Sequence, residues 1–377
     1  MMIVFRVDAS IKIGTGHVIR DLTLAEKLSK RGAKCNFISR AHPGHLIDLI
    51  RARGFQVHEL PQADSKVTID LEPKAGDQTC DDQNTDWLGT TQAEDSVQCS
   101  HILSTLQPDW LVVDHYSIGV EWEARLRSLC NHIMVIDDLA NRRHACDLLI
   151  DQTFGRSIAD YLKHVDIKCR LLCGSGFALI RDDFIRLRPY SLSRRKVPKL
   201  KRILISMGGV DQNNATGTVL NRLGSICKNV DVEFVVVMGS TAPWIGEVRE
   251  QASRLRNKTT VLAGVENMAE LMAEADLAVG AAGTTAWERC CLGLPSIIVT
   301  LASNQKTVAK SLHEAGAAKL VSLGEDLHFG LSQMIEQFLI NPAILNNISK
   351  SAARIVDGTG GIAVVKAMEE LGATKYC

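Results

Sequence analysis

A glycine-histidine motif near the N-terminus carries the residues best suited to chemistry. Gly14 and Gly16 flank Thr15 and permit a tight loop with positive φ and close backbone approach to a ligand. Apolar residues recur at helical spacing from Val18, so His17 is expected in the first turn of a helix. There the helix dipole disfavours imidazolium, and a neutral imidazole can act as a general base. The alternative is a phosphate loop in which His17 is only a donor or a spacer.

A second glycine-containing segment, residues 280–288, suits anion binding. It follows an apolar strand and opens a helix, so free backbone N–H groups and the helix dipole favour a negatively charged ligand. Thr284 and Thr285, after Gly283, can add hydroxyl donors to a diphosphate, and Glu288 can accept from ribose hydroxyls. The alternative is that this segment and the turn at Gly208-Gly209 are two ordinary strand–helix turns, with Glu288 as a surface or capping residue. The nucleotide interpretation is preferred.

Other expected strands also end in glycines or acids. Ligands of open α/β sheets bind beyond the carboxyl ends of the strands, where such residues would lie. For the acids, helix capping or turn formation is the equal alternative. The residues concerned are Gly208, Gly209, Asp114, Asp137, Asp138 and Asp151.

The bulk composition excludes several classes of protein. The 43 basic and 43 acidic residues balance, so the charge does not point to nucleic acid or an anionic membrane. No stretch approaches the roughly 18 apolar residues of a membrane span, and the N-terminus does not resemble a signal peptide, so a cytoplasmic protein is expected. The 11 cysteines are scattered and odd in number, which favours reduced thiols. No metal-binding motif occurs, and neither a metal nor a cofactor is expected.

Three familiar nucleotide-binding and hydrolase motifs are absent from the sequence. Ile19 stands where a dinucleotide fingerprint would need its third glycine, and the sequence has no Gly-Lys-Ser/Thr ending of a P-loop. It also lacks the Gly-x-Ser-x-Gly nucleophile elbow of serine hydrolases.

Strands alternate with helices in both halves of the chain, which predicts two Rossmann-like α/β domains with parallel sheets, facing across a cleft. We expect an N-terminal domain over residues 1–185, with a polar, mobile insertion at about 62–86. A basic linker is expected at 186–200 and a nucleotide-binding domain at 201–350. Residues 351–377 are expected to form a C-terminal helix that packs back on the N-terminal domain.

Motifs spread over nearly the whole chain resemble the UDP-2,4-diacetamido-2,4,6-trideoxy-β-L-altropyranose hydrolases of pseudaminic acid biosynthesis. The motifs are Arg6-x-Asp8-x-Ser10-x-x-Ile13-Gly14-x-Gly16-His17-x-x-Arg20-x-Leu22-x-Leu24-Ala25, Trp87-Leu88-Gly89, Val113-Asp114-His115-Tyr116, Ile136-Asp137-Asp138-Leu139-Ala140, Cys146-Asp147, Gly176-Phe177-Ala178-Leu179-Ile180-Arg181, Ser206-Met207-Gly208-Gly209-Val210-Asp211, the loop ending in Glu288, and Ser303-Asn304-Gln305.

The resemblance implies a glycosyltransferase-B-type fold, like that of lipid-linked N-acetylglucosaminyl transferases, used for metal-independent, inverting hydrolysis of a UDP-sugar. His17 would be the base that activates water. The implied substrate-binding residues are Asp8, Gly14, Gly16, Arg20, Tyr116, Arg181, Asn304 and Gln305, and the implied nucleotide-binding residues are Gly208, Gly209, Gly283, Thr284, Thr285 and Glu288.

Two of these roles stay open in the sequence. Asp8 orients either His17 or a sugar hydroxyl, and Arg181 reaches either a phosphate or an acidic partner in a structural salt bridge. Two positions depart from the family pattern, since Asp21 replaces a common cysteine and Ala363 replaces a frequent arginine.

The alternative functions are a glycosyltransferase of the same fold and a non-catalytic nucleotide-sugar sensor. The expected partner is a small-molecule UDP-sugar, without nucleic acid or membrane insertion. The sequence does not fix the oligomeric state.

Overall fold

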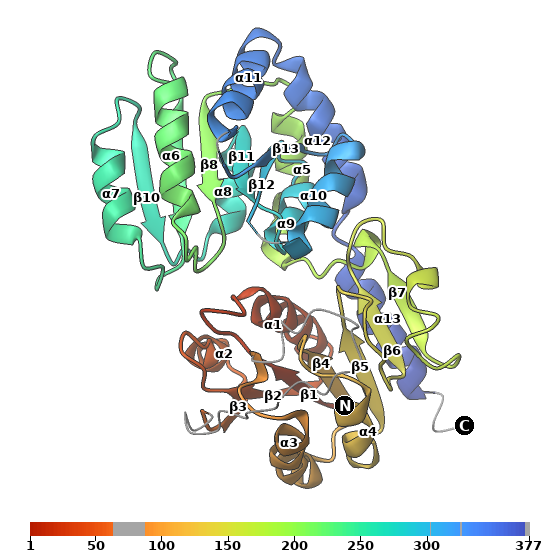
Figure 1. The fold of residues 1–377 in the computed structure, drawn as a ribbon. Coiled ribbons are helices and arrows are strands. Elements are labelled where there is room, and N and C mark those ends of the chain that lie inside the picture. The colour runs from red at the N-terminus through yellow and green to blue at the C-terminus, as the bar shows by residue number, and fades with distance from the viewer. Residues whose placement is uncertain (63–86, 302, 325, 374–377) are drawn as a thin grey trace, which may run out of the picture. The chain divides into compact units, whose positions relative to one another are not determined.

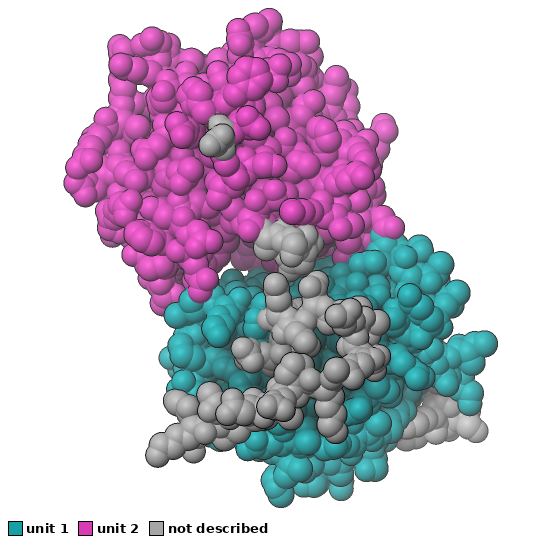
Figure 2. Space-filling model, in the orientation of Figure 1, with its two compact units in different colours: residues 1–152, 156–173, 362–377 teal, residues 153–155, 174–361 magenta. Residues whose placement is uncertain are grey.

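The chain forms two compact units, described here from a computed structural model covering residues 1–62, 87–301, 303–324 and 326–373. Unit 1 comprises residues 1–152, 156–173 and 362–377, and unit 2 comprises residues 153–155 and 174–361 (Figure 2). The insertion expected at 62–86 lies, after its first residue, outside the described residues. Among the residues that are described, no helix is long and apolar enough to cross a membrane.

Unit 1 is built on a seven-stranded parallel sheet with the strand order β3-β2-β1-β4-β5-β6-β7 (Figure 1). Strands β1 and β4 are buried along almost their whole length because apolar, mostly β-branched residues point to both faces. The strands are β1 (Met2–Val7), β2 (Lys34–Arg40), β3 (Gln56–Leu60), β4 (Trp110–Asp114), β5 (His132–Ile136), β6 (Leu148–Asp151) and β7 (Arg170–Cys173).

The helices of unit 1 mostly connect these strands. They are α1 (Gly16–Ser29), α2 (Ile47–Ala52), α3 (Gln92–Leu106), α4 (Val120–Leu126) and the returning helix α13 (Gly360–Ala373). Helix α13 belongs to this unit from Ile362 onward, and it forms ion pairs from Glu369 to Arg31 and from Glu370 to Arg170.

Unit 2 contains a six-stranded sheet in the order β10-β9-β8-β11-β12-β13, in which every pairing is parallel. Neighbouring residues of one strand enter different hydrophobic clusters: Ile203 and Ile205 pack on one face of the sheet, and Leu204 packs on the other. Both faces are therefore covered. The strands are β8 (Arg202–Ser206), β9 (Glu233–Met238), β10 (Thr259–Ala263), β11 (Leu277–Ala281), β12 (Ser296–Thr300) and β13 (Lys319–Ser322).

The helices of unit 2 cover these two faces. They are α5 (Asp182–Arg194), α6 (Ala215–Ile226), α7 (Ile245–Ser253), α8 (Met268–Glu274), α9 (Thr285–Cys291), α10 (Ser303–Glu314), α11 (Leu327–Ile340) and α12 (Ala343–Ile355).

The basic segment 186–200, expected as a linker, is largely part of helix α5 in unit 2. Its arginines do not simply face solvent. Arg188 donates to the carbonyls of Cys291, Ala353 and Val356, and Arg194 pairs with Asp276 at 2.6 Å. The positive charges therefore bind carbonyl groups and a carboxylate of unit 2, and the linker prediction is wrong for this segment.

Each sheet has one topological switch point, where the strand order reverses. In unit 1 it falls between β1 and β4, and in unit 2 between β8 and β11. Ligands of open α/β sheets bind beyond the carboxyl ends of the strands at these points. Both glycine-containing loops singled out in the sequence begin at a switch-point strand.

Candidate active site

The loop after β1 places His17 at the start of α1. The Ser10 hydroxyl oxygen accepts hydrogen bonds from the backbone N–H groups of Lys12 and Ile13, at 3.1 and 2.9 Å. Gly14 has a φ of +84° and donates its N–H to the Ser10 carbonyl at 2.8 Å. Gly14 thus supplies the left-handed turn, whereas Gly16 is already helical. The helix begins at Gly16, so His17 is its second residue, as the sequence predicts.

Asp114, at the end of β4, is the acid that contacts His17. Its Oδ1 lies 2.5 Å from His17 Nδ1. Arg20, one turn further along α1, contacts both oxygens of the same carboxylate, with Nε 2.5 Å from Oδ2 and Nη2 2.6 Å from Oδ1. All three side chains are buried. Burial alone would raise the pKa of Asp114, but Arg20 and His17 lower it well below its usual range, so the carboxylate is ionised.

This arrangement fixes which histidine nitrogen is available for chemistry. A carboxylate accepts hydrogen bonds only, so the His17 ring carries hydrogen on Nδ1 and donates it to Asp114. Arg20 Nη2 lies 3.2 Å from the same nitrogen, but its shorter contact is with the carboxylate. The lone pair of neutral His17 is consequently on Nε2, as a general base requires.

Asp138 and Tyr116 complete the polar surroundings of Arg20. Arg20 Nη1 donates to Asp138 Oδ2 at 2.6 Å, and the Tyr116 hydroxyl donates to the same oxygen at 3.0 Å. The Tyr116 ring meets His17 edge-on, with 4.6 Å between ring centroids. The side chain of Asp138 is 21% exposed, in contrast to the fully buried Asp114. Five motif residues therefore meet at the carboxyl ends of neighbouring strands: His17, Arg20, Asp114, Tyr116 and Asp138.

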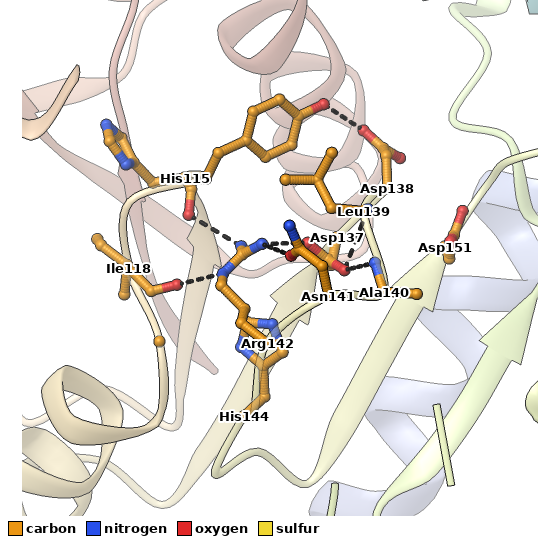
Figure 3. A network of polar contacts seen from close by, with 12 residues as sticks. His115, Ile118, Asp137, Asp138, Leu139, Ala140, Asn141, Arg142, His144 and Asp151 are labelled. Carbon is orange, nitrogen blue, oxygen red and sulfur yellow. Dashed lines mark hydrogen bonds and ion pairs between the residues drawn. The ribbon is translucent and has the colours of Figure 1, made fainter. Parts of the chain in front are cut away.

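The neighbouring acid, Asp137, is structural. Its carboxylate accepts the N–H groups of Leu139 and Ala140 and a hydrogen bond from Arg142 at 2.8 Å (Figure 3). Arg142 also donates to the carbonyls of His115 and Ile118, which ties the loops after β4 and β5 together. Asp137 is therefore a turn-forming residue, which is the alternative that the sequence left open for acids at strand ends. Its hydrogen bonds support the loop that carries Asp138.

Asp8 lies in a different network from His17. It is fully buried, its Oδ1 accepts from Arg6 Nη1 and from the Arg40 N–H, each at 2.7 Å, and its Oδ2 faces His42 and His115 at 3.5 and 3.4 Å. Burial opposes ionisation, but Arg6 holds the pKa of Asp8 well below its usual range. In this structure Asp114, not Asp8, orients His17, and the full burial of Asp8 does not favour contact with a sugar.

In unit 2, Arg181 and Glu288 form an ion pair. Arg181 Nε and Nη2 each lie 2.9 Å from Glu288 Oε1, and the guanidinium lies over the Phe184 ring at 4.6 Å. Burial raises the pKa of Glu288, and Arg181 opposes that rise. Of the two alternatives for Arg181, the structure shows the salt bridge with an acidic partner. That partner, Glu288, is only 8% exposed.

The small-residue loop between β11 and α9 leaves room beside its backbone. A Cβ on Gly283 would meet no atom within 4 Å, and Thr284 and Thr285 are half-exposed. Gly280 is confined instead, since a Cβ there would lie 2.5 Å from the Ser206 carbonyl oxygen. Gly283 and the two threonines are therefore the accessible part of the loop.

The remaining expected positions of unit 2 lie after neighbouring strands. Gly208 has a φ of +102° and open space beside it, and Gly209 follows it after β8. Gln305 accepts the Leu301 N–H at 3.2 Å, which ties it to the end of β12. Asn304 belongs to α10, but its side chain is outside the described part of the structure.

The sequence comparisons agree with this architecture. Residues 203–358 match the glycosyltransferase family 28 C-terminal domain. The uncharacterized protein MJ1062 of Methanocaldococcus jannaschii is 26% identical over 305 residues, covering 79% of this chain, and the chain spans only 55% of that relative. The UDP-2,4-diacetamido-2,4,6-trideoxy-beta-L-altropyranose hydrolase of Campylobacter jejuni is 25% identical over 316 residues, covering 84% of this chain and 97% of the hydrolase.

Comparison with solved structures concerns the fold. The crystal structure of Acinetobacter baumannii MurG matches with a TM-score of 0.67 and 16% identity, covering 98% of this chain and 99% of MurG. At such low identity the match establishes the fold alone. Together with the two parallel sheets, it confirms the predicted fold class of two Rossmann-like α/β domains.

Proposed function

We propose that the protein is a UDP-sugar hydrolase in which His17 activates the attacking water, and that its substrate carries a 2,4-diacetamido-2,4,6-trideoxy-β-L-altropyranosyl group. The observation that carries the proposal is the 2.5 Å contact between His17 Nδ1 and Asp114, which makes Nε2 the basic nitrogen. Similarity to the Campylobacter jejuni hydrolase over 84% of the chain supports this substrate and this reaction.

The proposed reaction is a single displacement. A water oxygen forms a bond to the anomeric carbon while the bond from that carbon to the β-phosphate oxygen breaks. The water proton passes to His17 Nε2, and UDP leaves with the electron pair. Asp114 and Arg20 hold the imidazole in position, and Asp114 stabilises the imidazolium that forms. Attack on the face opposite the leaving group inverts the anomeric configuration.

The proposed nucleotide site is in unit 2. Gly208, Gly283 and the two threonines after it present open backbone and hydroxyl donors beside the strand ends β8 and β11. Donors of this kind stabilise the negative charge of a leaving diphosphate, which is the same principle as an oxyanion hole. In this proposal, Glu288 accepts from the nucleotide's ribose hydroxyls, and Arg181 opposes the rise in the pKa of Glu288 that burial causes.

The test is UDP release from the UDP-linked diacetamido sugar in water, with no acceptor added. We expect the purified protein to release UDP and an inverted sugar. His17→Asn should lower kcat by roughly 100- to 10,000-fold, the usual contribution of a general base, and leave UDP affinity nearly unchanged. His101→Asn, which alters an exposed histidine on α3, is the matched control and should retain full activity.

Two outcomes would count against the proposal. Near-normal turnover by His17→Asn would remove His17 from the role of base. UDP release only after a sugar acceptor is added would favour the second candidate, a glycosyltransferase, which the family 28 match over residues 203–358 makes a specific alternative.

A further inference from the structure

Asp21 is a buried acid beside the catalytic centre that the proposed mechanism does not use. Its side chain is fully buried on α1, and no donor among the described residues reaches either of its oxygens. It lies instead within hydrogen-bonding reach of the Asp114 carboxyl group. Two ionised carboxylates in contact away from water repel each other strongly, so this pair is stable only when one of them carries a proton.

The surrounding charges decide which acid is protonated. Asp114 receives two hydrogen bonds from Arg20 and one from His17, whereas Asp21 receives none. Burial, followed by the charge of Asp114, raises the pKa of Asp21 well above its usual range, and Arg20 only partly opposes that rise. The proton therefore belongs to Asp21.

The hydrogen-bond count of Asp114 leads to the same assignment. An ionised carboxylate offers about four acceptor positions. His17 Nδ1 and Arg20 Nη2 approach Oδ1 at 2.5 and 2.6 Å, and Arg20 Nε approaches Oδ2 at 2.5 Å. One position is left, and the hydroxyl of a neutral Asp21 can fill it. The spacing of His17, Arg20 and Asp21 on α1 (i, i+3, i+4) puts all three on the helix face toward Asp114.

We propose that Asp21 is a neutral carboxylic acid that donates its hydrogen to Asp114, and that it thereby limits how strongly Asp114 stabilises the protonated form of His17. Asp21 is then a positioning residue and has no contact with substrate. This inference rests on the proposed function, because it concerns the availability of His17 as a base.

The charged groups around His17 show why the proton on Asp21 affects the protonation of His17. Arg20 contributes one positive charge, and Asp114 and Asp138 contribute two negative charges. Burial lowers the pKa of His115 and raises that of Tyr116, so both neighbours are neutral near pH 7. An ionised Asp21 would add a further negative charge and favour the imidazolium, which cannot accept a proton from water. Its neutral form avoids that charge.

The first test compares two kinds of substitution in the full-length protein. Asp21→Asn keeps a hydrogen-bond donor and has no charge, so kcat/KM should stay within about threefold of the wild type and its pH profile should not move. Asp21→Ala removes the donor and leaves Asp114 a stronger partner for imidazolium. Its acidic limb should move to higher pH by about one unit, a tenfold change in the protonation equilibrium. Asp21→Val, which also lacks a donor but fills more space, should give the same shift if the alanine variant folds poorly.

The outcomes separate donor, charge and packing roles. An unchanged profile in both donor-free variants, or an equal shift in Asp21→Asn, would overturn the proposal. A loss of kcat with no pH shift would indicate packing alone and would also overturn it.

The second test does not depend on turnover. Infrared difference spectra between wild type and Asp21→Asn at neutral pH should show the carbonyl band of a protonated carboxylic acid in the wild type only. A carboxylate band in its place would overturn the proposal. If the wild type releases no UDP, the proposed function fails, but this spectrum still decides the state of Asp21.

Discussion

The two switch-point sites use different chemical groups at similar positions of their sheets. In unit 1, the loop after β1 leads to His17 and Arg20, which share the buried carboxylate of Asp114. In unit 2, the loop after β11 presents an open glycine and half-exposed threonines, and Glu288 on the following helix pairs with Arg181. The first arrangement controls the position of a proton, and the second offers neutral donors and open backbone.

This difference suggests a division of labour. A histidine held by a buried carboxylate can accept and release a proton, but it is a poor holder for a diphosphate. Open backbone N–H and hydroxyl groups can bind a diphosphate without taking part in proton transfer. Substitutions at the site in unit 1 should therefore affect kcat, and substitutions at the site in unit 2 should affect UDP binding.

After His17→Asn, the largest effect is expected from Asp114→Asn. The amide cannot accept from both Arg20 and His17 as the carboxylate does, and it can reverse the tautomer of the imidazole. We expect kcat to fall by roughly 100-fold or more and the free energy of unfolding to fall by about 3–5 kcal/mol, because Arg20 loses a buried partner. Steady-state kinetics and urea unfolding measure both. Weaker UDP binding with unchanged kcat would remove the distinction between the units.

Acid should destabilise unit 1 before unit 2. Burial opposes ionisation of Asp95 and Asp137, but Arg6 and Arg142 lower their pKa values to about 2. Since these values are below about 3.9 in the unfolded chain, each acid stabilises unit 1 above that pH and loses its contribution as the pH falls toward 2, by about 2–3 kcal/mol each. In unit 2 the pKa of Glu288 is raised, so its protonation does not destabilise the unit. The pKa values of Glu233 and Asp357 are lowered, but these acids are less buried than Asp95 and Asp137, so solvent screens their interactions and their contribution is smaller.

This difference can be followed by tryptophan fluorescence in variants that retain the tryptophans of only one unit. The unit 1 signal should change at higher pH than the unit 2 signal. Coincident transitions would show that the buried acids of unit 1 do not determine its acid stability.

A smaller effect is expected from Glu288→Gln. The amide keeps an acceptor oxygen but loses the charge that strengthens hydrogen bonds to ribose hydroxyls. UDP affinity should fall about tenfold, equivalent to about 1.4 kcal/mol, with little change in kcat. Calorimetric titration with UDP measures the change in affinity. The control is Glu336→Gln, at an exposed position of α11, which should leave UDP affinity unchanged. A fall in kcat alone would show that Glu288 does not act on the ribose.

Much of the fold follows from local sequence patterns. Apolar runs such as residues 110–113 and 203–205 are typical of buried strands, and the structure places β4 and β8 there. Strand β7 is harder to recognise in the sequence, because it has only four residues and most of them are not fully buried. The basic segment was misread as a linker because sequence alone does not show that carbonyl groups more than 100 residues away bind its arginines.

The site was predictable where it depends on neighbouring residues in the chain. The glycine-histidine spacing predicted the position of His17 at the start of a helix. Arg20 follows His17 by three residues, which places both on one face of α1. Its acidic partner was not predictable, because Asp114 is 97 residues away and was one of several acids at strand ends. The sequence also left open whether Arg181 binds a phosphate or an acidic residue, because its partner Glu288 is 107 residues away.

The return of α13 to unit 1 has a consequence for synthesis on the ribosome. Unit 2 is complete by residue 361, whereas unit 1 begins first and still requires the helix that follows. Val364 and Met368 of that helix are buried, so until it emerges the nascent first unit exposes the apolar surface that they cover. The order of translation and the order of domain completion are therefore opposite. Proteolytic removal of the last helix would damage the domain that carries His17.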